Sequence, residues 1–532
     1  MAIPSALLLA AALLGGPVPP VDSVPLYTNL GSHHKAISTR VPAAQQYFDQ
    51  GLRLTYGFNH AEAIRSFTRA AALDSTCAMC YWGIALAHGP HVNAPMDSAG
   101  GVAAYAAVEQ ALALRSHASA RERAYIDAVA TRYEANPPAD RARLDSAYAS
   151  AMAKVAKAYP SDLDAATLYA ESLMDLRPWN YWRPDGTPYE GTTEIVRQLR
   201  KVLAGNPNHP GACHYYIHAV EAVDPAAAVP CAERLAQLMP GEGHMVHMPA
   251  HIYIRVGRWN DAVKANQHAI HSDEVFIEGQ QPSGVYPLAY YPHNIHFLAF
   301  ASTMAGRSAQ AIEASKTLVS KVNLAAARQV GMLQEMVPYH TLTLTTFGRW
   351  DDVLAEPLPP ADIRLSYGMA YYARGVAYAA KQQWAEAQAA LDTVTAIRDA
   401  TPDGADAKSP LSIAVEALAG EIATRRGDLD SGISHFQAAA KIEDAGLYFE
   451  PPKWYYPIRH SLGAALLKAG KNAEAEQVYR EDLKRFPENG WALFGLARAL
   501  EAQGKNAEAA RVDARFRKAW ADADVKLAAS RF

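Results

Sequence analysis

The stretch GKNAEA stands twice near the C-terminal end of the chain, first at Gly470–Ala475 and again at Gly504–Ala509. The two copies are 34 residues apart, and the same shift superimposes Leu462 on Leu496. Gly commonly ends a helix because it adopts the left-handed conformation, whereas Ala and Glu are strong helix formers. The sequence therefore predicts pairs of helices that are joined by a glycine turn and repeated along the chain.

Looser copies of this pattern occur upstream. They lie at Asn59–Ala63, Gly257–Ala262, Gly306–Ala311 and Gly348–Asp352. A period of this length is the signature of tetratricopeptide repeats, whose helix pairs bury their apolar faces by stacking on one another. We therefore predict an all-α fold, an irregular tetratricopeptide-repeat helical solenoid wound as a right-handed superhelix.

The composition agrees with stacked helices and argues against nucleic acid as a partner. Hydrophobic residues make up 50% of the 532 residues and charged residues 20%. The 50 Lys and Arg residues nearly balance the 54 Asp and Glu residues and do not gather into a basic stripe. Because nucleic-acid binding depends on such a stripe, we predict a protein or peptide partner and no nucleic acid.

An apolar run at Leu7–Leu14, followed by Gly15–Pro17, has the length of a signal-peptide core and is too short to span a bilayer. We predict a signal peptide at residues 1–22, cleavage between Pro17 and Pro25, and a periplasmic or secreted protein. The alternatives are a membrane anchor or a wrongly assigned start. No other segment has about 18 uninterrupted apolar residues, so no further membrane span is predicted.

Two interruptions divide the repeat array. A segment rich in Trp, Tyr and Pro at residues 177–192 is predicted to be an inserted loop, and Glu356–Pro360 breaks the helical pattern. We therefore predict an irregular, His-rich array at residues 27–355 and a regular array at residues 361–532. Because a long aromatic loop is costly to leave in water, we expect it to fold over the histidines of the first array.

Several His-rich motifs lie between residues 28 and 350. They include Leu30–His34, Phe58–Ala63, His214–Glu221, His247–Tyr253 and His293–Phe297. In these segments the chain resembles a group of bacterial exported tetratricopeptide-repeat proteins. The resemblance implies the fold and the compartment but no reaction. Relatives usually carry Asn where this chain has Cys213, so the resemblance implies no role for that thiol.

Histidines recur at helical spacing in the first array. His214, His218 and Glu221 stand at positions i, i+4 and i+7. His247 and His251 stand at i and i+4. Side chains at these spacings share one face of a helix. Each set is therefore predicted to present its polar groups as a stripe.

The repeat register aligns the second set with His293 and His296. His247 lies ten residues before the turn glycine Gly257, and His296 lies ten residues before Gly306. Neighbouring first helices of such repeats line the concave face and lie about 10 Å apart, so equivalent positions can converge. We predict one divalent-metal site formed by His214, His218, Glu221, His247, His251, His293 and His296.

Imidazoles at i and i+4 can bind one metal ion, with a carboxylate as a further ligand, and Zn, Cu, Fe or Ni fits such a donor set. His33, His34, His88 and His91 could complete the site, although no spacing requires it. His340 lies off the stripe and is excluded. His268 and His271 fall on a second helix, where we expect them to be solvated.

Three functions follow from this pattern. The first is an extracytoplasmic solenoid that binds a protein or small ligand on its concave face and carries a His-rich metal site. The second is a metal-dependent hydrolase or redox enzyme with Glu221 as general base. The third is a purely structural protein–protein scaffold with structural histidines. For the histidines themselves, the alternatives to a metal site are a metal-free ligand groove and plain packing. No catalytic, phosphate-binding, dinucleotide or haem-attachment motif decides between them.

The cysteines number four in the whole chain. Export permits disulfides, so Cys77 could pair with Cys80, and Cys213 with Cys231. The spacing leaves both pairings open.

Overall fold

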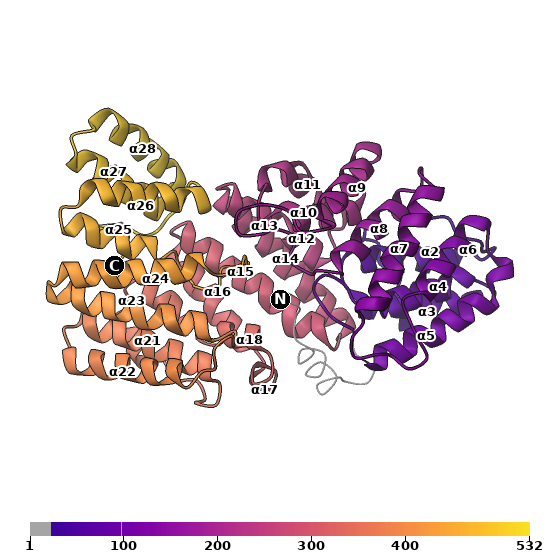
Figure 1. Ribbon diagram of the computed structural model, residues 1–532, viewed down its shortest axis with the longest axis horizontal. Coiled ribbons are helices and arrows are strands. Elements are labelled where there is room, and N and C mark those ends of the chain that lie inside the picture. Colours follow the sequence, from indigo (N-terminus) through magenta and orange to yellow (C-terminus); the bar gives the residue numbers. More distant parts are fainter. Residues whose placement is uncertain (1–22, 97) are drawn as a thin grey trace. The chain divides into compact units, whose positions relative to one another are not determined.

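The computed structural model describes residues 23–96 and 98–532, so the predicted signal peptide lies outside the described residues. Helices dominate the described chain, as Figure 1 shows. Within it, extended pairing is limited to two isolated bridges, His91 with Ala94 and Trp182 with Pro188. The predicted all-α fold is confirmed. No helix in residues 23–96 and 98–532 has the length and apolar character needed to cross a bilayer.

The chain forms two compact units. The first unit runs to Ile252 and also contains His268–Tyr291, whereas the second contains Tyr253–Gln267 and Pro292–Phe532. Helices α13 (Pro249–Arg255) and α14 (Trp259–Gln280) each contribute residues to both units, as does α15 through its first residue, Tyr291.

The other helices of the first unit are α2 (Pro42–Tyr56), α3 (His60–Leu73), α4 (Ala78–Ala87), α5 (Ser98–Ala113), η2 (Arg115–His117), α6 (Ala120–Ala130), α7 (Ala142–Ala158), α8 (Leu163–Met174), α9 (Thr192–Gly205), α10 (Pro210–Val220), α11 (Pro225–Leu238), α12 (Gly243–His247) and η3 (Tyr286–Tyr290). Sequential helices pack as neighbours, among them α2 on α3 and α10 on α11. This is the hairpin arrangement that the repeats predict.

The second unit contains α15 (Tyr291–Met304), α16 (Ser308–Lys321), α17 (Leu324–Ala327), α18 (Gly331–Met336), α19 (Tyr339–Thr346), α20 (Trp350–Ala355), α21 (Arg364–Ala380), α22 (Trp384–Asp399), α23 (Lys408–Arg426), α24 (Leu429–Asp444), α25 (Arg459–Lys468), α26 (Asn472–Arg485), α27 (Gly490–Ala502) and α28 (Asn506–Ala519). Helices α21 to α28 form a stack of helix pairs (Figure 1). Because α19 and α20 pack on α21, the break at Glu356–Pro360 lies inside this unit and does not divide it.

The two GKNAEA copies form equivalent turns. Gly470 lies in the turn after α25 and Gly504 in the turn after α27, and both have a φ of +73°. Side chains with a Cβ rarely adopt this conformation, which explains why Gly recurs there. Between the two turns, the Tyr479 ring of α26 is buried against Gly463 and Gly495, where a Cβ would overlap the ring.

The cysteines differ in state. Cys77 and Cys80 form a disulfide at the start of α4, and the Cys77 sulfur also accepts a hydrogen bond from the Cys80 backbone N–H. Cys213 and Cys231 are buried free thiols. Of the two pairings that the sequence leaves open, the structure contains the first.

Replacing Gly495 with Ala should destabilise the second unit, because the new methyl group would force the Tyr479 ring out of its place. Overpacking of this kind costs about 1–3 kcal/mol. Urea unfolding followed by circular dichroism measures the loss. Gly279→Ala is the control, since a Cβ there meets nothing within 4 Å, and this variant should lose no stability. Equal behaviour of the two variants would contradict the packing described for Tyr479.

Candidate metal centre

The centre of the site is α10, a helix whose residues are all buried. His209 caps its N-terminus, and Pro210 occupies its first turn, where a missing N–H costs nothing. His214 and His218 lie on the same face, with ring centroids 4.9 Å apart, as their spacing predicts. Their exposed fractions are 0% and 3%. They therefore lie in the interior of the first unit, whereas the sequence analysis expected them on an open face.

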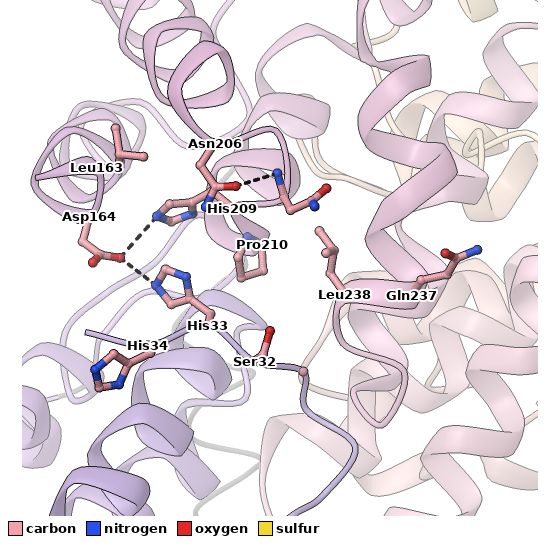
Figure 2. Close-up of a pocket in the computed structure, with 12 residues that line it drawn as sticks. Ser32, His33, His34, Leu163, Asp164, Asn206, His209, Pro210, Gln237 and Leu238 are labelled. Atoms are coloured by element: carbon pink, nitrogen blue, oxygen red, sulfur yellow. Dashed lines mark hydrogen bonds and ion pairs between the residues drawn. The ribbon is translucent and has the colours of Figure 1, made fainter. Parts of the chain in front are cut away.

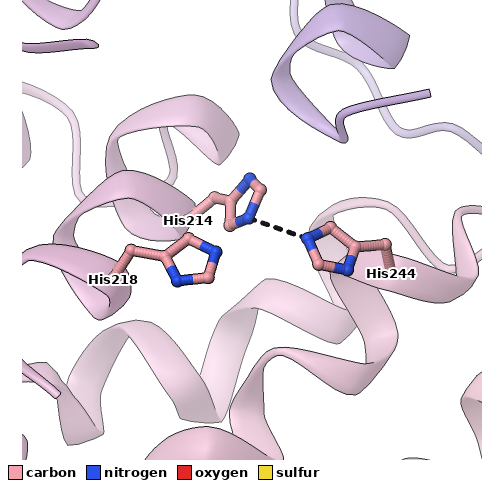
Figure 3. A group of neighbouring side chains, drawn as sticks. All are labelled: His214, His218 and His244. Carbon is pink, nitrogen blue, oxygen red and sulfur yellow. Dashed lines mark hydrogen bonds between the residues drawn. The ribbon is translucent and has the colours of Figure 1, made fainter. Parts of the chain in front are cut away.

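One backbone hydrogen bond sets the protonation of His214. Its Nδ1 lies 2.6 Å from the carbonyl oxygen of Tyr56, so Nδ1 carries the proton and donates it. In the neutral ring, Nε2 then holds the lone pair. This nitrogen faces Nε2 of His244 on α12 at 3.2 Å (Figure 3).

His218 has the same protonation pattern. Its Nδ1–H donates to Oε1 of Glu221 at 3.3 Å, which leaves a lone pair on Nε2. Nε2 of His218 is buried without a hydrogen-bond partner, and so is Nδ1 of His244. Burying polar atoms unpaired is costly, so such atoms in a native interior require an explanation.

His214, His218 and His244, which we call the imidazole trio, fit a metal ion. Each offers one ring nitrogen, and the three nitrogens lie within 4.8 Å of one another. Two ligands of a tetrahedral zinc ion lie about 3.3 Å apart, close to the separation of the His214 and His244 nitrogens. Metal-binding imidazoles also typically donate their second N–H to a carbonyl or a carboxylate, as His214 and His218 do.

Electrostatics keep the imidazole trio in the form that binds metals. Burial, and after it the neighbouring imidazoles, hold the pKa of all three rings well below the usual value of 6.5. The rings are therefore neutral at physiological pH, and only neutral imidazole has a lone pair to donate.

Glu221 connects the imidazole trio to a second pair of histidines. Its Oε2 accepts a hydrogen bond from Nδ1 of His251 at 2.8 Å, while Oε1 accepts the one from His218. Nε2 of His251 in turn lies 2.9 Å from Nε2 of His247. The structure thus brings together five of the seven predicted site residues in the first unit. In this arrangement Glu221 positions two imidazoles.

His293 and His296 lie on α15 in the second unit. The His293 ring packs on Phe297, with centroids 5.6 Å apart. His296 is buried, its ring centroid lies 4.2 Å from that of Tyr339, and burial lowers its pKa to about 3. Their contribution to a shared metal site stays a prediction.

His244 was not predicted as a site residue, although the sequence contains a signal for it. His244 lies thirteen residues before Gly257, the same offset as His293 before Gly306. It also stands at i−3 from His247. Phe58 was not predicted either, and its ring is tilted against that of His214, with centroids 4.5 Å apart.

The predicted aromatic loop does lie beside the histidines. The Trp179 ring stands edge-on to His218, with centroids 4.9 Å apart. Trp182 donates its indole N–H to the carbonyl of Ala219 on α10 at 2.7 Å. The expected placement of the loop is therefore confirmed, and the loop covers part of α10.

A second polar cluster contains His33, Asp164 and His209 (Figure 2). Oδ1 of Asp164 accepts hydrogen bonds from His33 at 2.9 Å, from His209 at 3.2 Å and from the Tyr56 hydroxyl at 2.7 Å. Nδ1 of His209 already accepts the Ala212 backbone N–H, so its Nε2 carries the proton. That ring has no lone pair facing Asp164, and the cluster is an internal hydrogen-bond network, with no need of a metal.

The remaining histidines occupy separate places. His340 bonds to the Ser315 hydroxyl at 3.0 Å in the second unit. His268 and His271 are exposed on α14, as expected. Among the suggested additional histidines, His91 lies near the imidazole trio, since its ring stacks on Phe58 at 4.5 Å.

Comparison with known proteins identifies the repeat. Residues 466–523 match the tetratricopeptide repeat model. A search of curated proteins found no match.

Three solved structures are similar over most of their length. The human IFIT1 dimer with m7Gppp-AAAA is 12% identical, with a TM-score of 0.32 over 91% of each chain. The Cut9–Hcn1 hetero-tetramer of APC/C is 12% identical, with a TM-score of 0.30 over 90% of this chain and 76% of that one. Yeast Tom70 is 12% identical, with a TM-score of 0.26 over 92% and 93%. Similarity at this level carries no inference about function.

The burial of His296 predicts how stability depends on pH. Its folded-state pKa of about 3 lies below the ordinary 6.5, so between these values the unfolded chain binds a proton that the folded chain does not. Stability should therefore fall as pH drops, and this residue should account for about 2 kcal/mol between pH 7 and pH 5. Urea unfolding measures this. Between pH 7 and pH 5, the free energy of unfolding of His296→Phe should fall by less than that of the parent protein, and the difference should equal that amount. An unchanged slope of stability against pH in His296→Phe would contradict this interpretation.

Proposed function

We propose that this tetratricopeptide-repeat protein holds one divalent metal ion at the imidazole trio and works outside the cytoplasm as a ligand-binding protein. Tetratricopeptide repeats suit the binding of proteins or small ligands. The observation that carries the metal proposal is the convergence of three buried imidazole nitrogens, two of them on rings with an unpartnered buried nitrogen.

Packing alone explains this arrangement less well than a metal does. Without a metal, Nε2–H of His244 can donate to the lone pair of His214 Nε2 at 3.2 Å, but Nε2 of His218 and Nδ1 of His244 stay buried without a partner, which costs free energy. An ion at their centre would accept the lone pairs and replace this cost with coordination bonds. Glu221 and the Tyr56 carbonyl already hold two rings in the required orientation. Imidazole donors favour Zn, Cu, Fe or Ni.

A metal-dependent hydrolase or redox enzyme is the second candidate. It is favoured by one feature, because three protein ligands would leave a coordination position open, as catalytic zinc sites do. Both oxygens of Glu221 are engaged with His218 and His251, so the carboxylate fits a positioning role better than the role of general base.

Substitution of ligands should remove the metal. Protein purified without a His tag should carry about one equivalent, which elemental analysis measures. The double variant His214→Ala/His218→Ala should lose it, because two of three ligands are gone. His244→Ala alone should weaken the affinity at least tenfold, since this ring supplies the third nitrogen.

The matched control is His268→Ala/His271→Ala, which removes two exposed histidines from α14 of the same chain. It should keep the full metal content, as should His340→Ala. If the ligand double variant and the control double variant held equal metal, the imidazole trio would be reduced to packing.

Export is proposed from the apolar run at Leu7–Leu14. Cell fractionation with N-terminal sequencing should find a mature chain that begins between Pro17 and Pro25 outside the cytoplasm. A cytoplasmic protein that retains Met1 would overturn this part of the proposal.

A further inference from the structure

A cavity of about 330 Å³ lies beside the imidazole trio in the first unit. Its wall comes from the start of α3, the end of α4 with the segment that follows, and the segment at residues 283–290. A volume of this size accommodates a small organic molecule.

Two aromatic residues form the wall between the cavity and the imidazole trio. Phe58 lines the cavity, and its ring centroid lies 4.5 Å from that of His91 and 4.5 Å from that of His214. Tyr290 also lines it, with a ring centroid 4.7 Å from that of His244. A molecule in the cavity would therefore lie one side chain away from the imidazole trio.

Both wall residues stand on unusual backbone. Phe58 has a φ of +58°, a left-handed conformation that bulky residues rarely adopt. Tyr290 ends η3, a π-helical turn that begins at Tyr286, and the Tyr286 hydroxyl is fixed by Asp273 at 2.7 Å. Phe58 occupies the turn position that Gly470 holds in a later repeat, so its conformation belongs to the helix turn, whereas π-helical turns occur frequently at functional sites.

The lining favours an uncharged occupant. Among the described residues that line the cavity, none is Asp, Glu, Lys or Arg. Apolar contacts come from Ile64, Pro95 and Met96, and ring faces come from Phe58 and Tyr290. A charged group would lose its hydration here without gaining a partner of opposite charge.

The polar groups of the lining provide hydrogen bonds. His60 lies at the start of α3, where its ring already interacts with the backbone of Ala87 and Thr55, and burial lowers its pKa to about 3, so the ring is neutral. His91 accepts the Asn93 backbone N–H on Nδ1 at 3.3 Å, which leaves its Nε2–H as a donor. Neutral donors and acceptors beside aromatic faces match a planar ring that carries an amide or carbonyl.

We propose that this cavity binds a neutral, planar aromatic molecule with an amide-like or carbonyl substituent, next to the imidazole trio. This inference deepens the proposed ligand-binding function and rests on it. Another cavity in the first unit, of about 510 Å³, contrasts with it, because Asp164 and three histidines, His33, His34 and His209, make its lining polar and charged.

Three probes of equal shape and different charge test the proposal. Naphthalene-2-carboxamide is neutral, 2-naphthoate is an anion and 2-naphthamidinium is a cation. Titrations of the full chain, followed by calorimetry or ligand-observed NMR, should find that the neutral probe binds at least tenfold more tightly than either charged probe. Equal or tighter binding of a charged probe would overturn the proposal, as would the absence of binding by all three.

A substitution then locates the binding. Ala61 is exposed on α3 and lines the cavity. The Phe side chain of Ala61→Phe should therefore fill the cavity and weaken the binding of the neutral probe at least tenfold. Ala72→Phe is the matched control, because Ala72 is exposed on the same helix and is not among the cavity-lining residues. If Ala61→Phe loses its helical signal, Ile64→Trp takes its place. Unchanged affinity in the filled variant would overturn the proposal.

Titration before and after dialysis against a chelator separates this inference from the metal proposal. A protein that binds the neutral probe but no metal would refute the metal centre alone. A protein that holds metal but no probe would refute the cavity proposal alone.

Discussion

The hydrogen bond from Nδ1 of His214 to the Tyr56 carbonyl is the contact on which the candidate metal centre depends. Tyr56 is the last residue of α2, so the bond ties the end of that helix to the middle of α10. The Tyr56 hydroxyl donates to Asp164, which also accepts a hydrogen bond from His209, the N-cap of α10. A single tyrosine therefore connects both polar clusters and fixes which nitrogen of His214 carries the proton.

Protonation is what gives the imidazole trio its chemistry. A buried imidazole that donated on both nitrogens would be charged, and burial opposes charge. The Tyr56 carbonyl and the Glu221 carboxylate each take one N–H, so His214 and His218 direct their lone pairs away from these acceptors. The aromatic shell of Phe58, Trp179 and Tyr290 excludes water from the rings, which strengthens any interaction within.

Periodic features were predictable from the sequence, whereas contacts between distant segments were not. The glycine turns at Gly470 and Gly504 and the shared face of His214 and His218 depend on local spacing. The place of His244 was also encoded, in its offset from the turn glycine. Which nitrogen of His214 carries the proton depends on the carbonyl of Tyr56, 158 positions away in the sequence. The spacing of residues within α10 does not reveal this contact. The burial of the histidines likewise results from the packing of α2, α12 and the aromatic loop around α10.

The proposed metal ion would be coordinated by three imidazoles of the first unit. X-ray absorption spectroscopy of metal-loaded protein, purified without a His tag, tests this coordination most directly. We expect three imidazole nitrogens at about 2.0–2.1 Å with one or more oxygen donors, as in open zinc sites. A coordination shell of oxygen or sulfur without the multiple scattering of imidazole rings would contradict it.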